Sequence, residues 1–301
     1  MRDSASGPLR FDDQVVIVTG AGAGLGKAHA DLLADRGAHV VVNDVGRTAQ
    51  GRPAAEEVVE EIRARGGSST ADTSDISTKE GAEAVVASAV AAGGRLIAVV
   101  NNAGIVRDAS FARMSAEEAT RVVDVHLWGT FWVSQAAWPI FREQQAGRIV
   151  NTTSTAAYLG NFGQANYGAA KGGIIGLTKV LAIEGRQRNI LVNSVAPAAA
   201  TAMTDGLLGD LAERLSPERV SALVAYLAHP SCEVTGEVFH AGAGAVSRVF
   251  YSQTRGIFHD DLTPEHVRDE WARVMDDSDA LPALGIQEEL AIHDASAAHL
   301  Q

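Results

Sequence analysis

Hydrophobic residues occur along the chain either in short continuous runs or at every third or fourth position of longer segments. Runs rich in valine and isoleucine and apolar on both faces predict buried strands at 15–20, 39–44, 96–104, 148–154 and 190–197. Helical periodicity between them predicts helices at about 25–36, 53–66, 78–92, 116–145 and 166–186. Buried strands that alternate with helices indicate a parallel sheet covered on both sides. With right-handed crossovers, we predict an α/β fold, a doubly wound parallel sheet of the Rossmann type.

The pattern changes near residue 250. Residues 1–250 show no internal repeat and no low-complexity linker, which predicts one domain. Residues 251–301 have weaker periodicity, and we expect a C-terminal extension packed on this domain or on a second subunit. Within it, Thr263 and Pro264 suit the N-cap and first position of a helix over 263–275.

Composition excludes several classes of protein. The 301 residues are 46% hydrophobic and carry a net charge of −12 without basic runs, which argues against nucleic-acid binding. No apolar run reaches the roughly 18 residues that span a membrane, and the N-terminus does not read as a signal peptide. The single Cys232 excludes an internal disulfide, so we expect a cytoplasmic location. The nine scattered histidines show no metal-ligand spacing, which predicts no metal.

A glycine-rich loop follows the first strand directly. The G-x-G-x-x-G register fails at Leu25, but T-G-x-x-x-G-x-G fits. A strand-to-helix turn of this kind allows close backbone approach to a pyrophosphate and points helix amides at it. We therefore predict that this loop binds a dinucleotide; its residues are Thr19, Gly20, Gly24, Leu25 and Gly26. A merely flexible turn is the alternative.

Asp44 stands at the end of the second predicted strand, eighteen residues after Gly26. A carboxylate there accepts from the ribose 2′-hydroxyl and repels a 2′-phosphate, which favours NAD over NADP. The nearby Arg47 could instead receive a 2′-phosphate, which would favour NADP. A further alternative is that Asn43 and Asp44 only form a turn and bind no ligand.

Tyr167 and Lys171 are four residues apart among alanines and glycines. On a helix they share a face, and a cation beside a phenol lowers the tyrosine pKa. The pair therefore predicts a general acid or base with an electrostatic partner. A chance surface pair is the alternative on spacing alone.

Four features occur in this order along the chain: "TGAGAGLG", "NNAG", Ser154 and "YGAAK". On these features the chain resembles the short-chain dehydrogenase/reductases over about residues 10–245. Further segments, including "NFGQANYGAAK" and "LTPEHVRDEW", resemble the dehydrogenase part of the peroxisomal multifunctional enzyme type 2 family. That resemblance implies NAD-dependent oxidation of a 3-hydroxyacyl-CoA, fatty-acyl or steroid side-chain, in β-oxidation. The alternatives are an NADPH-dependent 3-oxoacyl reductase, oxidation of a free 17β-hydroxysteroid and, remotely, a non-catalytic dinucleotide sensor.

The resemblance also implies roles for individual residues. Tyr167 is the expected proton acceptor, Lys171 its partner and ribose ligand, and Ser154 the ligand of the substrate oxygen. The expected nucleotide contacts beyond the glycine loop are Asp75, Ile76, Asn102, Ala103, Gly104, Pro197 and Thr201.

Two positions depart from the pattern of the family. His126 stands where an asparagine is usual; it either supports a proton-relay water through its backbone carbonyl or is an ordinary helix histidine. Ala198 replaces a glycine, which puts a positive φ at that position in doubt.

In the family that the chain resembles, the helix at 166–186 and the long helix before it pack across a two-fold interface, so the resemblance implies a homodimer. The glycines and alanines of the 166–186 helix would allow a partner helix to approach closely, and Trp128 and Trp132 would lie in that contact. A tetramer is the alternative assembly, and core packing is the alternative role of the tryptophans.

Overall fold

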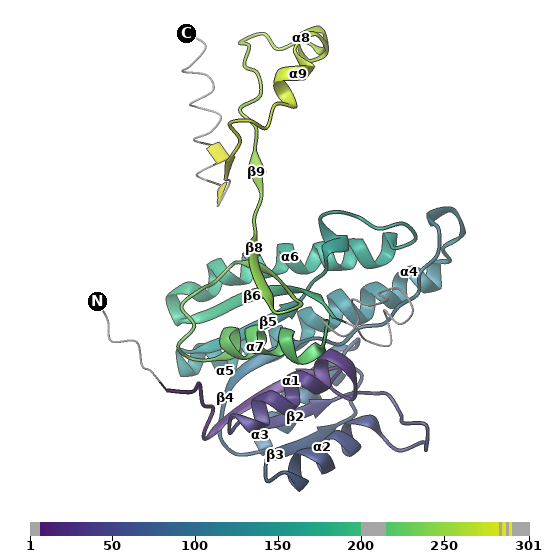
Figure 1. The fold of residues 1–301 in the computed structure, drawn as a ribbon, viewed down its shortest axis with the longest axis vertical. Helices are drawn as coiled ribbons and strands as arrows, with labels where there is room; N and C mark the ends of the chain where they lie inside the picture. The colour runs from purple at the N-terminus through teal and green to yellow at the C-terminus, as the bar shows by residue number, and fades with distance from the viewer. Residues whose placement is uncertain (1–6, 200–214, 283–284, 287–288, 291–301) are drawn as a thin grey trace. The chain divides into compact units, whose positions relative to one another are not determined.

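Eight strands form one sheet in the order β3-β2-β1-β4-β5-β6-β7-β8 in a computed structural model of the protein (Figure 1). All paired neighbours from β3 to β7 run parallel. The strands are β1 Gln14–Thr19, β2 His39–Asn43, β3 Ser68–Asp72, β4 Arg95–Asn101, β5 Gly147–Thr152, β6 Ile190–Ala198, β7 Val238–Gly242 and β8 Ala245–Val249. The predicted fold class is confirmed, and strand order reverses between β1 and β4, where such sheets bind ligands.

The structure describes residues 7–199, 215–282, 285–286 and 289–290. The chain divides into two compact units, Met1–Arg248 and Val249–Gln301. No helix within the described ranges is long and apolar enough to cross a membrane.

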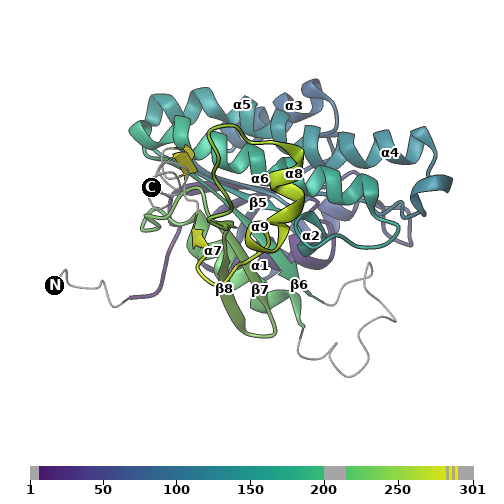
Figure 2. The same ribbon diagram turned by 90° about the horizontal axis from the view of Figure 1, so that it is seen from above.

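Helices cover both faces of the sheet in the first unit (Figures 1 and 2). Alternate residues of β1 point to opposite sides: Val16 and Val18 belong to one buried cluster, Val15 and Ile17 to the other. The first cluster includes side chains of α1 Gly24–Asp35, α2 Ala54–Ala64 and α7 Pro217–Ala228. The second includes side chains of α3 Lys79–Ala91, α5 Gly129–Gln144 and α6 Ala165–Gly185. Both faces are apolar because both are covered.

The helix predicted over 116–145 runs without a break, but it is not α-helical throughout. It consists of α4 Ala116–Val123, a π-helical segment η2 Asp124–Trp128 and α5. Such single-turn π segments occur inside α-helices without a residue signature of their own, so the apolar pattern predicted one long helix and not this segment. Short 3₁₀ turns lie at η1 Phe111–Arg113, η3 Thr155–Ala157 and η4 Arg186–Arg188.

The second unit contains β9 Ser252–Gln253, α8 Pro264–Asp269, α9 Trp271–Val274 and β10 Leu281–Pro282. Strands β9 and β10 pair antiparallel. The helix predicted over 263–275 is interrupted at Glu270 (φ −108°, ψ 17°), although Thr263 caps its start as expected by accepting from the His266 amide at 3.3 Å.

Candidate active site

The carboxyl ends of β1 and β4 are tied together by side-chain hydrogen bonds. The buried Thr19 hydroxyl accepts from the backbone amides of Asn102 (3.0 Å) and Ala103 (3.2 Å). In the other direction, the Asn102 side-chain amide donates to the carbonyls of Thr19 (3.0 Å) and Gly20 (3.1 Å). The two loops that follow these strands are therefore held in a fixed relation.

Two glycines in the first loop have no room for a side chain. Gly20 has φ +63°, and a Cβ on it would lie 2.6 Å from Ala103 Cα. On Gly26 a Cβ would lie 2.1 Å from the Gly20 carbonyl oxygen. Glycine is thus required for the turn that brings the start of α1 over the ends of β1 and β4.

A cleft of about 260 Å³ opens beside this turn. It is lined by Gly20, Ala23, Gly24, Leu25, Gly26, Asp44, Asn102, Gly104, His126, Thr152, Tyr167, Lys171 and Pro197. Sequence reasoning named all of these except Ala23 and Thr152, which carry no motif of their own. Of the other predicted residues, Thr19, Asp75, Ile76, Ala103 and Ser154 are not among the lining, and Thr201 lies outside the described residues.

Asp44 is fixed at the edge of the cleft by two backbone amides. Its carboxylate accepts from Gly22 N at 2.8 Å and from Gly46 N at 2.7 Å. Arg47 is exposed and donates to the Gly51 carbonyl at 2.8 Å. The acidic group therefore stands next to the glycine turn, while the nearby arginine is engaged by its own loop.

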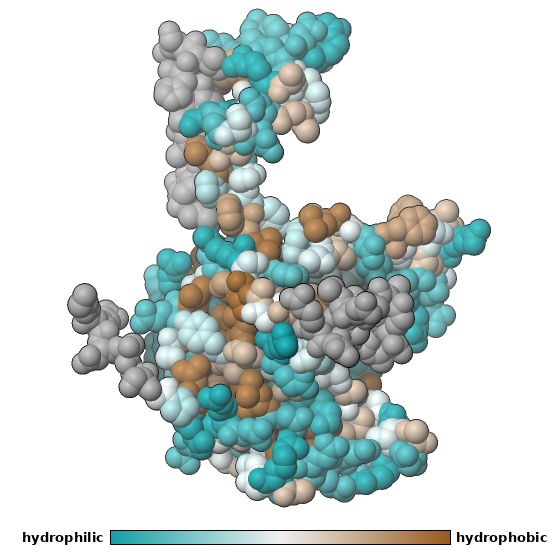
Figure 3. All heavy atoms as spheres, in the orientation of Figure 1, coloured by the Kyte–Doolittle hydropathy of each residue, from teal (hydrophilic) through white to brown (hydrophobic). Residues whose placement is uncertain are grey.

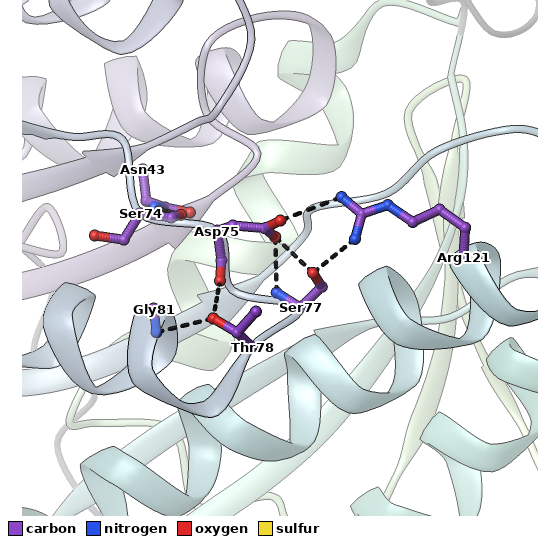
Figure 4. Close-up of polar contacts among 7 residues, drawn as sticks. All are labelled: Asn43, Ser74, Asp75, Ser77, Thr78, Gly81 and Arg121. Carbon is purple, nitrogen blue, oxygen red and sulfur yellow. Dashed lines mark hydrogen bonds and ion pairs between the residues drawn. The ribbon is translucent and has the colours of Figure 1, made fainter.

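Asp75 lies in a polar cluster with Ser77 and Arg121 (Figure 4). Its carboxylate accepts from the Ser77 amide (3.0 Å), the Ser77 hydroxyl (2.7 Å) and Arg121 Nη2 (3.2 Å). Burial raises the pKa of Asp75, but hydrogen bonds from Ser77 and Arg121 outweigh it and leave the pKa below its usual value. Its neighbour Ile76 is buried and belongs to the core. Arg121, which sequence reasoning missed, connects the loop after β3 to α4.

Lys171 is 2% exposed, on the inner face of α6. Its Nζ donates to the Thr152 carbonyl at the end of β5, at 2.6 Å. Burial lowers the pKa of Lys171 to about 7, because a charged ammonium loses water there. The side chain therefore exchanges its proton near neutral pH.

Tyr167 lies one helical turn before Lys171 and beside Ser154. The Lys171 Nζ is 5.7 Å from the centre of the tyrosine ring. Burial raises the pKa of Tyr167, and a hydrogen bond with Ser154 opposes this by lowering it. The sequence predicted that Lys171 lowers the Tyr167 pKa. The structure differs because desolvation raises that pKa by more than the Ser154 hydrogen bond lowers it, and the Lys171 ammonium is directed to the Thr152 carbonyl.

His126 lies in the π-helical segment and is 3% exposed. Its Nε2 is 2.8 Å from the Ile105 carbonyl oxygen and 3.0 Å from the Ile105 nitrogen, and its ring meets Tyr167 edge to face at 5.2 Å. Burial, reinforced by repulsion from Lys171, lowers the pKa of His126 to about 3, so the imidazole is neutral at neutral pH. Its backbone carbonyl accepts from the Thr130 hydroxyl at 2.7 Å.

The start of α6 is anchored by Asn166, another residue missed from sequence. Its buried side chain donates to the carbonyls of Arg107 (2.9 Å) and Glu118 (3.2 Å) and accepts from the Tyr167 amide (2.7 Å). A single asparagine carries no recognisable signal. Ala198 follows Pro197 of the cleft lining, ends β6 and is not among the residues with positive φ, so alanine fits where the family pattern has glycine.

Comparison with known proteins identifies the family. The sequence profile of the short chain dehydrogenases matches residues 14–210. The chain belongs to this family. It is 47% identical over 290 residues to peroxisomal multifunctional enzyme type 2 of Mus musculus, covering 93% of this chain and 39% of that protein.

Two further relatives extend the comparison. A 3-oxoacyl-[acyl-carrier-protein] reductase of Synechocystis is 40% identical over 243 residues, covering 77% of this chain and 97% of that protein. The crystal structure of a short chain dehydrogenase from Mycobacterium avium superposes with a TM-score of 0.80 at 38% identity, covering 92% of this chain and 98% of that one. The chain spans only 31–61% of the lengths of the peroxisomal relatives it matches.

As a short-chain dehydrogenase the protein is an oxidoreductase, and its fold binds a nicotinamide dinucleotide. The cleft fits such a ligand in two respects. Glycines line it where a Cβ would collide with backbone, and the buried His126 Nδ1 beside it has no partner among the described residues.

Replacing Gly26 with alanine tests this cradle. We expect Gly26→Ala to weaken dinucleotide binding at least about tenfold, because the new methyl group displaces the Gly20 carbonyl and with it the turn. Fluorescence titration with the reduced coenzyme measures the affinity. The matched control is Gly176→Ala, where a Cβ meets nothing within 4 Å; equal affinities of the two variants would contradict the prediction.

The depressed pKa of Lys171 predicts how stability depends on pH. Below about pH 7 the lysine is protonated in both states, and above it only the unfolded chain keeps the proton, up to its usual 10.5. Because the unfolded state binds more protons in this window, the lysine makes stability rise with pH, by up to about 1.4 kcal/mol per pH unit. Urea unfolding of wild type and Lys171→Met at pH 6–9 measures it. A stability difference that is constant across this range would refute the prediction.

Proposed function

We propose that the protein oxidises the secondary alcohol of a 3-hydroxyacyl-CoA, fatty-acyl or steroid side-chain, to the 3-oxoacyl-CoA with NAD. The observation that carries the proposal is that Tyr167 and Lys171 line the cleft bordered by the glycine turn and Asp44, with Ser154 hydrogen-bonded to Tyr167 and Lys171 bonded to the end of β5. A nicotinamide coenzyme held by the glycine turn and Asp44 would supply the hydride acceptor for the carbinol carbon.

The three side chains divide the acid–base work. The Ser154 and Tyr167 hydroxyls bind the substrate oxygen, and Tyr167 takes its proton. Since burial raises the pKa of Tyr167, its deprotonation depends on the hydrogen bond from Ser154 and on positive charge nearby. Lys171 supplies that charge when protonated and, with its pKa about 7, exchanges a proton at working pH.

His126 has a positioning role in this scheme. A pKa of about 3 keeps its ring neutral, so it does not act as an acid–base group. The ring closes the space next to Gly104, where a Cβ would lie 2.3 Å from His126 Cε1, and packs against the Tyr167 ring. Support of a relay water by its backbone carbonyl stays a prediction.

The choice of NAD rests on Asp44. Its carboxylate is held by the amides of Gly22 and Gly46 where the adenosine ribose is expected, and a second negative charge from a 2′-phosphate would be repelled. Asp75 and Ile76 are proposed to frame the adenine, with the Asp75 side chain held in place by Arg121.

The substrate class rests on similarity to the peroxisomal multifunctional enzymes. The second candidate is an NADPH-dependent 3-oxoacyl reductase, favoured by the name of the Synechocystis relative and disfavoured by Asp44. Oxidation of a free 17β-hydroxysteroid and a non-catalytic sensor have less support, the latter because a complete acid–base set has no use in a sensor.

A homodimer is the proposed assembly, with a tetramer as the alternative. Trp128 is 40% exposed and stacks on Trp132 at 5.5 Å, and on α6 Ile183 is 75% exposed. Such apolar surface suits contact with a second subunit. The cytoplasmic location stays a prediction, as does packing of the C-terminal extension on the domain or on the second subunit.

Removing one hydroxyl tests the proton transfer. We expect Tyr167→Phe to lower kcat by about 10²- to 10⁴-fold while NAD affinity changes by less than about twofold. Stopped-flow and binding titrations measure the two quantities. Tyr226→Phe, at an exposed tyrosine of α7, is the control that should behave as wild type. Parallel loss of NAD binding in Tyr167→Phe would refute the assignment.

Coenzyme and substrate are tested together by following reduced coenzyme in absorbance. The panel is a straight-chain 3-hydroxyacyl-CoA, a steroid side-chain hydroxyacyl-CoA and a free 17β-hydroxysteroid, each with NAD and NADP. We expect turnover of a CoA thioester with NAD. Turnover with NADP alone would overturn the role of Asp44, and turnover of the free steroid alone would overturn the thioester.

A further inference from the structure

Three side chains with metal-ligating atoms converge in the second unit. His259 and Asp261 lie in the loop before α8, and His266 lies within α8. One ligand atom of each lies within 4.8 Å of the others. Ligands of one zinc ion, bonded at ~2.0–2.2 Å, lie roughly 3–4 Å apart, so small side-chain rotations would bring these three to that spacing.

Hydrogen bonds engage His259 Nε2 and His266 Nδ1, and among the described residues the other nitrogen of each imidazole has no hydrogen-bond partner. His259 Nε2 pairs with the Glu270 carboxylate at 2.5 Å, and Glu270 is held in turn by Arg273. His266 Nδ1 is 3.4 Å from the Thr263 amide, which donates to it in the cap of α8. A carboxylate bonded to the far nitrogen of a histidine is the usual second partner of a metal-binding imidazole, because it fixes the ring and its tautomer.

The rings of His259 and His266 are already ordered against each other. They stack with centroids 4.2 Å apart and planes within 15°. The Asp261 side chain is exposed beside them and contributes the one carboxylate of the group. Two imidazoles and a carboxylate match divalent transition metals such as zinc better than calcium or magnesium, which prefer oxygen ligands alone.

The described residues of the second unit form no buried core of their own. None of its described residues is buried, and several apolar side chains are exposed in it, as the brown and tan atoms of Figure 3 show. Phe250, Leu262, Trp271 and Met275 are each more than half exposed. Small units that bury little apolar surface commonly depend on a cross-link such as a metal ion.

We propose that His259 Nδ1, the Asp261 carboxylate and His266 Nε2 form a structural site for a divalent metal ion of the zinc class, with water completing the coordination. Glu270 is the positioning residue for His259. The spacing H-x-D-x₄-H is not a familiar metal motif, which is why the sequence predicted no metal; it is the turn into α8 that brings the ligands together. The proposal is independent of the reaction catalysed in the first unit.

Calorimetric titration of the chelator-treated full chain with zinc chloride tests the proposal, with visible absorption of the cobalt complex as a second readout. We expect one equivalent per chain. His259→Gln and Asp261→Asn should each weaken binding at least about tenfold, and Glu270→Gln by about 10–100-fold. His39→Gln is the matched control, because both ring nitrogens of His39 are already bonded to the hydroxyls of Ser68 and Thr70.

Asp261→Asn is the decisive variant, since it alters an exposed side chain and leaves the cap of α8 unchanged. Circular dichroism and turnover of each variant verify that the first unit is folded. No binding by wild type, or wild-type affinity in His259→Gln and Asp261→Asn, would overturn the proposal. Weakening of zinc binding by His39→Gln to the same extent would overturn it as well.

Discussion

The close approach of two backbone segments, the turn after β1 and the loop after β4, is the constraint on which the rest of the site depends. Glycine at 20 and 26 removes the side chains that would keep them apart, and the Thr19–Asn102 hydrogen bonds hold them together. The start of α1, Asp44 and the loop that carries Gly104 all take their positions from this contact. A parallel sheet makes it available because the strands end at one edge.

The second feature that determines the chemistry of the site is the burial of two basic side chains, Lys171 and His126, without a carboxylate partner. Lys171 and His126 are almost completely buried, and each is matched by a backbone carbonyl. A carbonyl dipole compensates less for lost water than a full negative charge does, so the pKa of each side chain is lowered: His126 is neutral at neutral pH, and Lys171 exchanges its proton there. The charge of Lys171 beside Tyr167 is therefore not fixed, and it is sensitive to whatever charge a ligand introduces.

The sequence predicted the elements whose apolar pattern is strong and missed those held by tertiary contacts. Strands such as 15–20 and 190–197 agree with β1 and β6 to within a residue, whereas β3, "SSTAD", is too polar to stand out although it completes the sheet. Within the site, motif residues could be named because glycine, tyrosine and lysine recur at fixed spacing. Arg121 and Asn166 could not, since each acts through contacts with distant segments. The direction of the Tyr167 pKa shift could not be predicted for a similar reason. The spacing identifies Lys171 as a neighbour, but it does not show how deeply the Tyr167 hydroxyl is buried.

Asp44 does more than border the cleft, because its carboxylate also receives the Gly22 amide and leaves no space for a side chain there: a Cβ on Gly22 would lie 2.8 Å from Asp44 Cγ. The residue on which the proposed choice of NAD rests therefore also holds the glycine turn in place. An engineer who exchanged it for a neutral or basic residue would remove a charge and loosen the loop in one step. Redesign of coenzyme choice in this scaffold therefore calls for a paired change that restores an acceptor for the Gly22 amide.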